Sequence, residues 1–235
     1  MVGLHRVKVS GLVWGPDGLL NIYGPEVHHL HVLRKKKNQE VFVFDGLGQE
    51  CRARILDISP SVARLERLED IENHHEMPQK VTLCVALLKG DKLSDVVRAA
   101  TELGVFAIQL MVTQYADATE IGDAKLNRLR RIAEEASKQC RRAVVPEVRF
   151  PIHLRELPQI EQGYVAHPVG QPNWSKNIVW DKPIWLASGP EGGFHDSEID
   201  FLQQQGFGAV SLGQRILRAE TAPVAMLGAI AALGV

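Results

Sequence analysis

Two glycine-containing stretches carry most of the structural information in this 235-residue chain: Gly189-Pro190-Glu191-Gly192-Gly193-Phe194 and Leu212-Gly213-Gln214-Arg215-Ile216-Leu217-Arg218-Ala219-Glu220-Thr221-Ala222. Each includes or follows a short apolar run, residues 184–187 and 209–212, and each precedes a segment with helical spacing. Glycine tolerates a positive φ and lets backbone amides approach a ligand without a Cβ in the way. Two such turns at the carboxyl ends of parallel strands predict a backbone-lined ligand slot at one edge of an open α/β sheet.

The chain around these turns alternates between apolar runs and helical segments. Continuous apolar runs at residues 81–88 and 105–112 are typical of strands buried on both faces, and residues 164–166 form a shorter run of the same kind. The predicted helices span residues 91–103, 124–142, 197–206 and 224–233. Alternating strands and helices predict an α/β domain with a parallel sheet.

The first part of the chain has a different rhythm. Residues 4–68 contain short apolar stretches, and Val41-Phe42-Val43-Phe44 before Asp45-Gly46 is the clearest strand and turn among them. These stretches predict a compact β-barrel. The polar residues 72–79 interrupt the pattern and indicate a linker. We therefore expect a small β-barrel domain in residues 1–73 and an α/β domain in residues 78–235.

Composition limits the class of protein. Apolar residues make up 45% of the chain, which is ample for a globular core, and no apolar run approaches the length of a membrane span. The N-terminus lacks the pattern of a signal peptide, and three scattered cysteines favour a reducing, cytoplasmic location. The formal net charge of −1 gives no overall indication of nucleic-acid binding. Any RNA-binding surface must therefore come from locally clustered lysine and arginine side chains.

The two glycine motifs also resemble those of a known family. GPEGGF at residues 189–194 and LGxRILRxETA at residues 212–222 are similar to motifs of the ribosomal RNA small-subunit methyltransferase E family, in the SPOUT superfamily. The similarity extends over nearly the whole chain, through His28-x-x-x-Val32-Leu33-Arg34, Phe44-Asp45-Gly46, Lys89-Gly90-Asp91-Lys92, Ala100-Thr101-Glu102-Leu103-Gly104, Glu135-Ala136-x-x-Gln139-Cys140-x-Arg142 and Val145-Pro146.

This resemblance implies a fold, an activity and a partner. The implied fold is a PUA-like β-barrel that binds RNA, followed by a SPOUT domain whose parallel sheet carries a deep trefoil knot. The implied activity is methylation of N3 of one uridine in 16S ribosomal RNA of the small subunit, with S-adenosyl-L-methionine as methyl donor. A homodimer is also implied, and neither a membrane nor DNA is an expected partner.

The methyl-donor site is expected at three loops. The resemblance and the glycine turns together assign it to His167, Pro168, Gly189, Pro190, Glu191, Gly192, Leu212, Gly213, Ile216, Leu217 and Arg218. Leu212, Ile216 and Leu217 can hold a flat adenine between them, and nearby backbone groups can bind its edge. Without the glycine turns, the same three side chains would be interpreted as core packing.

Methylation at N3 of uracil requires loss of the N3 proton, so a cation that stabilises the resulting anion is expected nearby. Arg218 is the first candidate for that electrostatic role, and Glu191 is a weaker candidate for the base that takes the proton. An equally good interpretation has the Glu191 carboxylate accepting hydrogen bonds from backbone amides at its turn. Glu220-Thr221 is expected to cap the last helix.

The basic residues expected to contact RNA are Arg6, Arg34, Lys35 and Arg142. Arg34 and Lys35 begin a basic run that can also be interpreted as an ordinary solvated loop. The sequence departs from the family at three places that bear on RNA contact and dimer packing. His31 replaces a usual arginine, Gln114-Tyr115 stands where relatives often carry Glu-Arg, and Arg141 replaces a residue that is often small.

The histidines at positions 28, 29, 31, 74 and 75 lack the cysteine pair or HExxH helix of a zinc site, so no metal is expected. Two other functions stay open. One is a SPOUT methyltransferase that acts on a ribose 2′-hydroxyl or on tRNA, and the other is a non-catalytic RNA-binding factor in ribosome assembly. The glycine turns favour an enzyme over the last of these, because a protein that had lost its ligand would not need them.

Overall fold

The structure is a computed structural model that describes residues 4–234. The chain forms two compact units, one of residues up to Glu76 with Ser137–Val145, and one of Met77–Ala136 with Pro146–Val235. No local pattern in the sequence indicates that Ser137–Val145 belongs with the N-terminal unit. The division into domains at residues 1–73 and 78–235 stays our proposal. Among residues 4–234, no helix has both the length and the apolar character needed to span a membrane.

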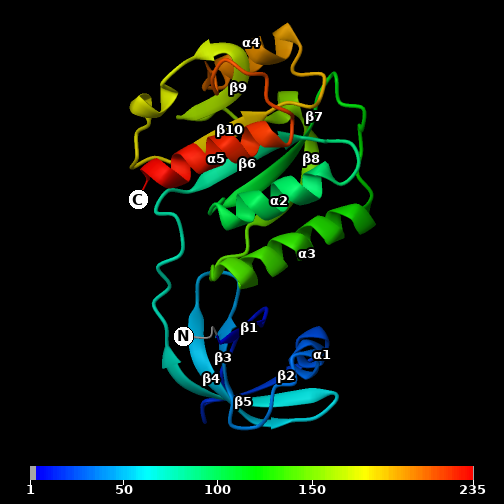
Figure 1. The fold of residues 1–235 in the computed structure, drawn as a ribbon, viewed down its shortest axis with the longest axis vertical. Helices are drawn as coiled ribbons and strands as arrows, with labels where there is room; N and C mark the ends of the chain where they lie inside the picture. The colour runs from blue at the N-terminus through cyan, green and yellow to red at the C-terminus, as the bar shows by residue number, and fades with distance from the viewer. Residues whose placement is uncertain (1–3, 235) are drawn as a thin grey trace. The chain divides into compact units, whose positions relative to one another are not determined.

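The N-terminal unit is built on a curled five-stranded sheet (Figure 1). Its strands, in spatial order, are β1 (His5–Lys8), β3 (Glu40–Phe44), β4 (Glu50–Ile58), β5 (Val62–Asp70) and β2 (Leu19–Tyr23). β1 pairs in parallel with β3, and the other neighbours are antiparallel. Alternate residues such as Val41 and Val43 are fully buried inside the curl. The prediction of a small β domain is confirmed.

Helix α1 (Pro25–Val32) was not predicted. It starts after Gly24, which has a φ of 69°, and Pro25 occupies its first turn, where a proline costs no hydrogen bond. Only Val27 and Leu30 are buried along its length. Two apolar contacts in eight residues give too weak a helical period to distinguish this segment from a strand.

The second unit contains a parallel sheet in the order β11-β9-β10-β6-β7-β8. Its strands are β6 (Val81–Ala86), β7 (Ala107–Val112), β8 (Glu147–His153), β9 (Gly163–Gln171), β10 (Ile184–Ser188) and β11 (Phe207–Val210). The helices between them are α2 (Lys92–Glu102), α3 (Asp123–Cys140), α4 (Asp196–Gln204) and α5 (Thr221–Leu233), with short 3-10 helices η1 (Leu154–Glu156) and η2 (Trp174–Asn177). The parallel α/β sheet and the four helices are confirmed, while β8 was not predicted.

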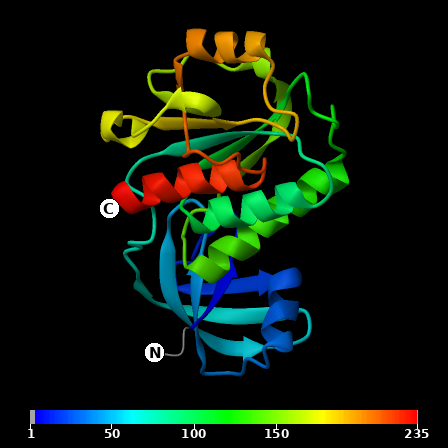
Figure 2. The same cartoon turned by 45° about the horizontal axis from the view of Figure 1, so that its top comes forward.

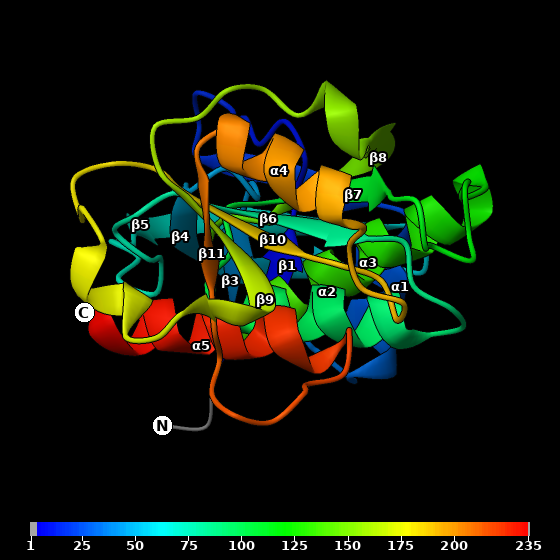
Figure 3. The ribbon, with the colours of Figure 1, turned by 90° about the horizontal axis from the view of Figure 1, so that it is seen from above.

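Helices cover both faces of this sheet. α2 and α5 pack side by side on one face, and α4 lies on the opposite face (Figure 2 and Figure 3). Every residue of β6 and β7 is buried, which explains their continuous apolar sequences. Because all six strands are parallel, their carboxyl ends meet at one edge of the sheet.

β9 lies between β10 and β11 and pairs with both of them. At Gly170 a Cβ would lie 2.4 Å from the backbone of Val210, so only glycine allows the two strands to approach this closely. The register of the β9–β11 pair shifts at the same place, between Ala209 and Val210. The trefoil knot implied by the family resemblance stays a prediction.

Candidate active site

A cavity of about 570 Å³ lies at the edge of the sheet where β9, β10 and β11 end. It is lined by His167 and Pro168 from β9, by residues 188–191 after β10, and by residues 216–220 after β11. Ligand sites in proteins commonly have volumes of about 300–1,000 Å³. The cavity is therefore large enough for a cofactor of several linked groups.

A smaller cavity of about 90 Å³ adjoins the first and shares part of its wall. Leu212 and Gly213 line it together with Ile216 and Leu217. All the residues predicted to bind the cofactor, except Gly192, line one of these two cavities. Ile216 is 89% exposed, so it is not a core residue, and the alternative of simple core packing does not hold for it.

Gly192 supports the cavity wall from behind and is not among the lining residues. A Cβ at Gly192 would lie 2.9 Å from the Cβ of Tyr115, so the glycine lets Tyr115 pack against the turn. The Tyr115 ring meets His195 edge-on, with 5.7 Å between ring centroids. The next residue, Gly193, has a φ of 75° and lines the cavity itself.

Lys92 is a cavity residue that the sequence analysis missed. It is the first residue of α2, and its Nζ lies 2.7 Å from Glu191 Oε1 and 3.7 Å from Glu220 Oε2. The sequence signal was the Lys89-Gly90-Asp91-Lys92 motif, but only the fold brings residue 92 between these two distant carboxylates. The result is a cluster of mixed charge at one end of the larger cavity.

The Glu191 carboxylate is already engaged. Its Oε1 accepts hydrogen bonds from Lys92 Nζ at 2.7 Å and from the backbone N–H of Lys89 at 3.3 Å. Partial burial acts to raise the pKa of Glu191, but the contacts with Lys92 and with backbone amides outweigh it and lower that pKa below its ordinary value. A carboxylate with a lowered pKa is a weak proton acceptor. The geometry therefore favours the alternative reading of Glu191 as a hydrogen-bond acceptor at the turn.

Glu220 and Arg218 lie on the loop before α5. The Arg218 guanidinium is 3.9 Å from Glu220 Oε1, and the Arg218 side chain is 85% exposed at the cavity mouth. Glu220 precedes α5 directly but makes no side-chain capping hydrogen bond, so its expected capping role is wrong. Its carboxylate lines the larger cavity instead, and Oε2 is buried without a hydrogen-bond partner among the described residues.

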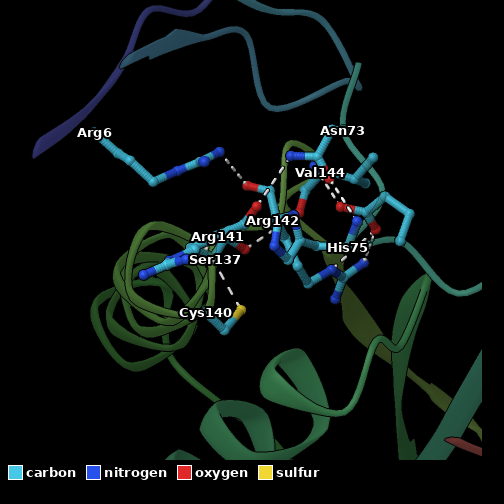
Figure 4. Close-up of polar contacts among 9 residues, drawn as sticks. Arg6, Asn73, His75, Ser137, Cys140, Arg141, Arg142 and Val144 are labelled. Atoms are coloured by element: carbon cyan, nitrogen blue, oxygen red, sulfur yellow. Dashed lines mark hydrogen bonds and ion pairs between the residues drawn. The ribbon is translucent and has the colours of Figure 1, made fainter. Parts of the chain in front are cut away.

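Two of the predicted RNA contacts prove to be structural. Arg6 and Arg142 are only 6% and 2% exposed. Arg6 donates from Nη2 to the Arg142 carbonyl at 2.9 Å (Figure 4) and forms an ion pair with Glu50. Arg142 forms an ion pair with Glu76 at 2.8 Å. These contacts attach residues 137–145 to the N-terminal unit. Their guanidinium groups are occupied and shielded, so the prediction that Arg6 and Arg142 contact RNA is wrong.

Arg34 and Lys35 follow α1 in a different setting. Arg34 is exposed and has a φ of 53°, and Lys35 is half-buried. Arg34 forms no ion pair with a carboxylate within residues 4–234. The two side chains remain candidates for RNA contact.

A family of RNA methyltransferase domains matches residues 75–231, and a family of RNA methyltransferase PUA domains matches residues 22–65. A ribosomal RNA small subunit methyltransferase E from Synechocystis sp. is 35% identical over 224 residues, which cover 88% of this chain and 71% of the relative. This chain belongs to the ribosomal RNA small subunit methyltransferase E family. The member from Bacillus subtilis is 30% identical, with 89% of this chain and 88% of the relative covered.

A solved structure shows the same architecture over nearly the full length. The ribosomal RNA small subunit methyltransferase E of Neisseria gonorrhoeae, bound to S-adenosyl methionine, matches with a TM-score of 0.90 and 28% identity, and the match covers 98% of each chain. The fold of this methyltransferase is therefore that of a PUA-like domain followed by a SPOUT domain.

The first prediction concerns the charge cluster. Replacing Lys92 with methionine keeps most of the aliphatic stem but removes the ammonium group, so the pKa of Glu191 should rise toward its ordinary value. Carbon-detected NMR titration of the Glu191 carboxyl measures this pKa directly.

The same substitution should change how stability depends on pH. Because the pKa of Glu191 is lower in the folded state than in the unfolded state, its ionised form stabilises the fold above the unfolded-state pKa, and this contribution is lost as the pH falls through the folded-state pKa. Lys92→Met should therefore lose less stability on acidification than the wild type. Lys182→Met, which removes a partner of Glu161, is the control. An unchanged Glu191 pKa would contradict the assignment.

The second prediction separates the two kinds of arginine. Arg142→Ala should lower the free energy of unfolding by about 2–3 kcal/mol, since it leaves the Glu76 carboxylate without the guanidinium that donates to it. Arg34→Ala should change that free energy by less than about 0.5 kcal/mol. It should instead flatten the dependence of log K on log salt for binding ribosomal RNA by about 0.7–0.9, the loss of one phosphate contact. Denaturant unfolding and salt-dependent binding check both, and the reverse pattern would restore Arg142 as an RNA contact.

Proposed function

We propose that this protein transfers a methyl group from S-adenosyl-L-methionine to N3 of one uridine in 16S ribosomal RNA of the small subunit. The observation that carries the proposal is the cavity at the ends of β9, β10 and β11, built from the two glycine motifs that the family shares.

The cavity residues fit the methyl donor. Its adenine is flat, with two ring faces that pack well against apolar groups and a polar edge, and the small cavity offers the side chains of Leu212, Ile216 and Leu217 for the ring faces. Its amino-acid tail carries an ammonium and a carboxylate, and the larger cavity offers both Glu191 and Lys92 at one end. Backbone groups at Gly189 and Gly193 are accessible because no Cβ covers them.

S-adenosyl-L-methionine supplies an electrophilic methyl group on a sulfonium when it is bound. In the transfer, the new bond joins the methyl carbon to uracil N3, the sulfur–methyl bond breaks, and the N3 proton leaves to an acceptor. The lone pair of N3 becomes available only after that proton is lost. Arg218, exposed at the cavity mouth, is placed to stabilise the negative charge that develops on the uracil ring.

Glu220 is a better candidate than Glu191 for the proton acceptor. Glu191 is held by Lys92 and by a backbone amide, whereas Glu220 Oε2 has no hydrogen-bond partner among residues 4–234. Lys92 Nζ lies 3.7 Å from Glu220 Oε2, which is beyond hydrogen-bond distance, whereas it lies 2.7 Å from Glu191 Oε1. A cavity-lining carboxylate whose buried oxygen accepts no hydrogen bond from residues 4–234 can accept a proton from a substrate bound beside it.

The RNA is proposed to contact Arg34 and Lys35 in the N-terminal unit and to present its target uridine, turned out of the base stack, to the catalytic unit. The near-neutral net charge of −1 means that these local charges carry the attraction. Because the assembled small subunit is a cytoplasmic particle, we infer that the protein acts in the cytoplasm.

The test is methylation of assembled small ribosomal subunits followed by nucleoside analysis, with 3-methyluridine as the expected product. Arg218→Ala should lower kcat by about a hundredfold and change the KM for RNA much less, since its charge is needed mainly in the transition state. Arg98→Ala is the control, because Arg98 pairs with Asp95 on the surface of α2.

Two results would contradict the proposed function. A 2′-O-methylated nucleoside would show that the acceptor is a ribose hydroxyl. Equal production of 3-methyluridine on an unrelated RNA would show that the small subunit is not the specific substrate.

We also propose a homodimer that forms through α5. This helix leaves Ala225 and Ala232 exposed and Leu233 54% exposed, so a second copy could approach closely. A two-fold dimer is the commonest closed assembly. Sedimentation velocity at micromolar concentration should show a dimer for the wild type and for Gln204→Arg on α4, and a monomer for Ala225→Arg. A monomeric wild type would refute it.

A further inference from the structure

A second groove lies at the carboxyl ends of β7 and β8, separate from the donor cavity. Its volume is about 330 Å³, near the lower end of the about 300–1,000 Å³ range for ligand sites. Thr113 and Gln114 line one side, and His153 and Arg155 line the other. The hydroxyl of Thr113 is buried and has no hydrogen-bond partner among residues 4–234, which is a costly state for a polar group.

The loop that follows β7 is held firmly between this groove and the donor cavity. The Gln114 N–H donates to Glu198 Oε1 at 2.8 Å, and Asp117 forms an ion pair of 2.9 Å with Lys89. Between these anchors, Tyr115 packs against Gly192 on the outer side of the GPEGGF turn. The loop therefore has one contact on each side of Tyr115, and Tyr115 itself is 48% exposed.

The charges of the groove favour an anionic ligand. Arg155 forms no ion pair with a carboxylate within residues 4–234, and its guanidinium lies 5.6 Å from the Phe201 ring centroid and 3.4 Å from Ser197 Oγ. The carboxylate of Glu198 also lines the groove, but both of its oxygens accept hydrogen bonds from backbone amides, at Gln114 and at His195. His195 caps the N-terminus of α4, where the helix dipole further offsets the negative charge.

We propose that this groove, with Tyr115, binds one nucleotide of single-stranded RNA next to the target uridine. The base stacks on the exposed face of Tyr115, the phosphate is bound by Arg155, and the ribose or base edge meets the polar groups at Thr113 and Gln114. The proposal rests on the proposed function, because the ligand is a segment of the RNA that is methylated.

Single-stranded RNA is the ligand class that needs all of these features at once. Proteins bind unpaired bases by stacking them on aromatic side chains and bind the backbone with arginine or lysine. Tyr115 is next in the chain to Gln114, which lines the groove, and it packs against Gly192, which is next to Gly193 of the donor cavity. A nucleotide in the groove would therefore lie on the other side of the GPEGGF turn from the methyl donor. It would fix which nucleotide of the RNA strand reaches the donor cavity.

The test uses the full chain and a fluorescein-labelled oligouridylate, with binding followed by fluorescence anisotropy across a series of salt concentrations. Arg155→Met should flatten the dependence of log K on log salt by about 0.7, the value for one phosphate of a single strand. Arg149→Met is the matched control, because Arg149 lies on the preceding strand and pairs with Glu147.

Tyr115→Ala should weaken oligouridylate binding by at least about tenfold, whereas Tyr115→Phe, which keeps the ring, should bind within about twofold of the wild type. The affinity for S-adenosyl-L-methionine, measured by calorimetry, should stay the same in Arg155→Met. The same variants should raise the KM for assembled small subunits in the methylation assay.

Three outcomes would overturn the inference. Arg155→Met and Tyr115→Ala could both bind oligouridylate as the wild type does. They could lose affinity only for assembled subunits, which would make the groove a protein-docking site. Tyr115→Phe could fail as badly as Tyr115→Ala, which would assign the effect to the hydroxyl and not to stacking. If the wild type binds oligouridylate through the groove but makes no 3-methyluridine, the proposed function fails and the RNA site stands.

Discussion

Parallel pairing of β9 with both β10 and β11 is the constraint on which the rest of the catalytic unit depends. It brings three carboxyl ends to one edge, so the chain segments that leave them must surround a common space. Glycine makes the arrangement possible, because the backbone of Val210 approaches Gly170 more closely than any side chain would allow. The cavity at these strand ends is thus a consequence of strand order and backbone contact, and the side chains that line it adapt a space that the sheet creates.

Charge is distributed differently in the two units. In the N-terminal unit, the buried arginines have structural roles, because the contacts of Arg6 and Arg142 hold the segment after α3 in place. In the catalytic unit, Lys92 sits between two carboxylates at the rim of a cavity, and Arg218 remains largely exposed. Arginines that all lie in family-like motifs therefore differ in burial, and motif similarity alone does not reveal which of them are buried in ion pairs.

The sequence predicted those parts of the fold that have a strong local signal. The buried strands β6 and β7 are continuous apolar runs, and the two glycine motifs contain most of the residues that line the cavity at the strand ends. It missed β8, because only Val148 of that edge strand is fully buried and the rest alternates with polar residues and a proline. It misassigned Arg6, Arg142 and Glu220, because their roles are set by partners far away in the chain. Lys92 was missed for the same reason: no local pattern indicates a lysine that will lie beside residues 191 and 220.

The central claim is that the ends of β9, β10 and β11 together hold the methyl donor. The most direct measurement is the mapping of amide chemical shifts during titration with S-adenosyl-L-methionine. We expect the largest shifts at Gly189, Gly193 and Leu217, which line the cavity, and unchanged shifts at Gln114 and Leu154 in the second groove. Saturable shifts centred on the second groove, or no saturable shifts at the three strand ends, would contradict it.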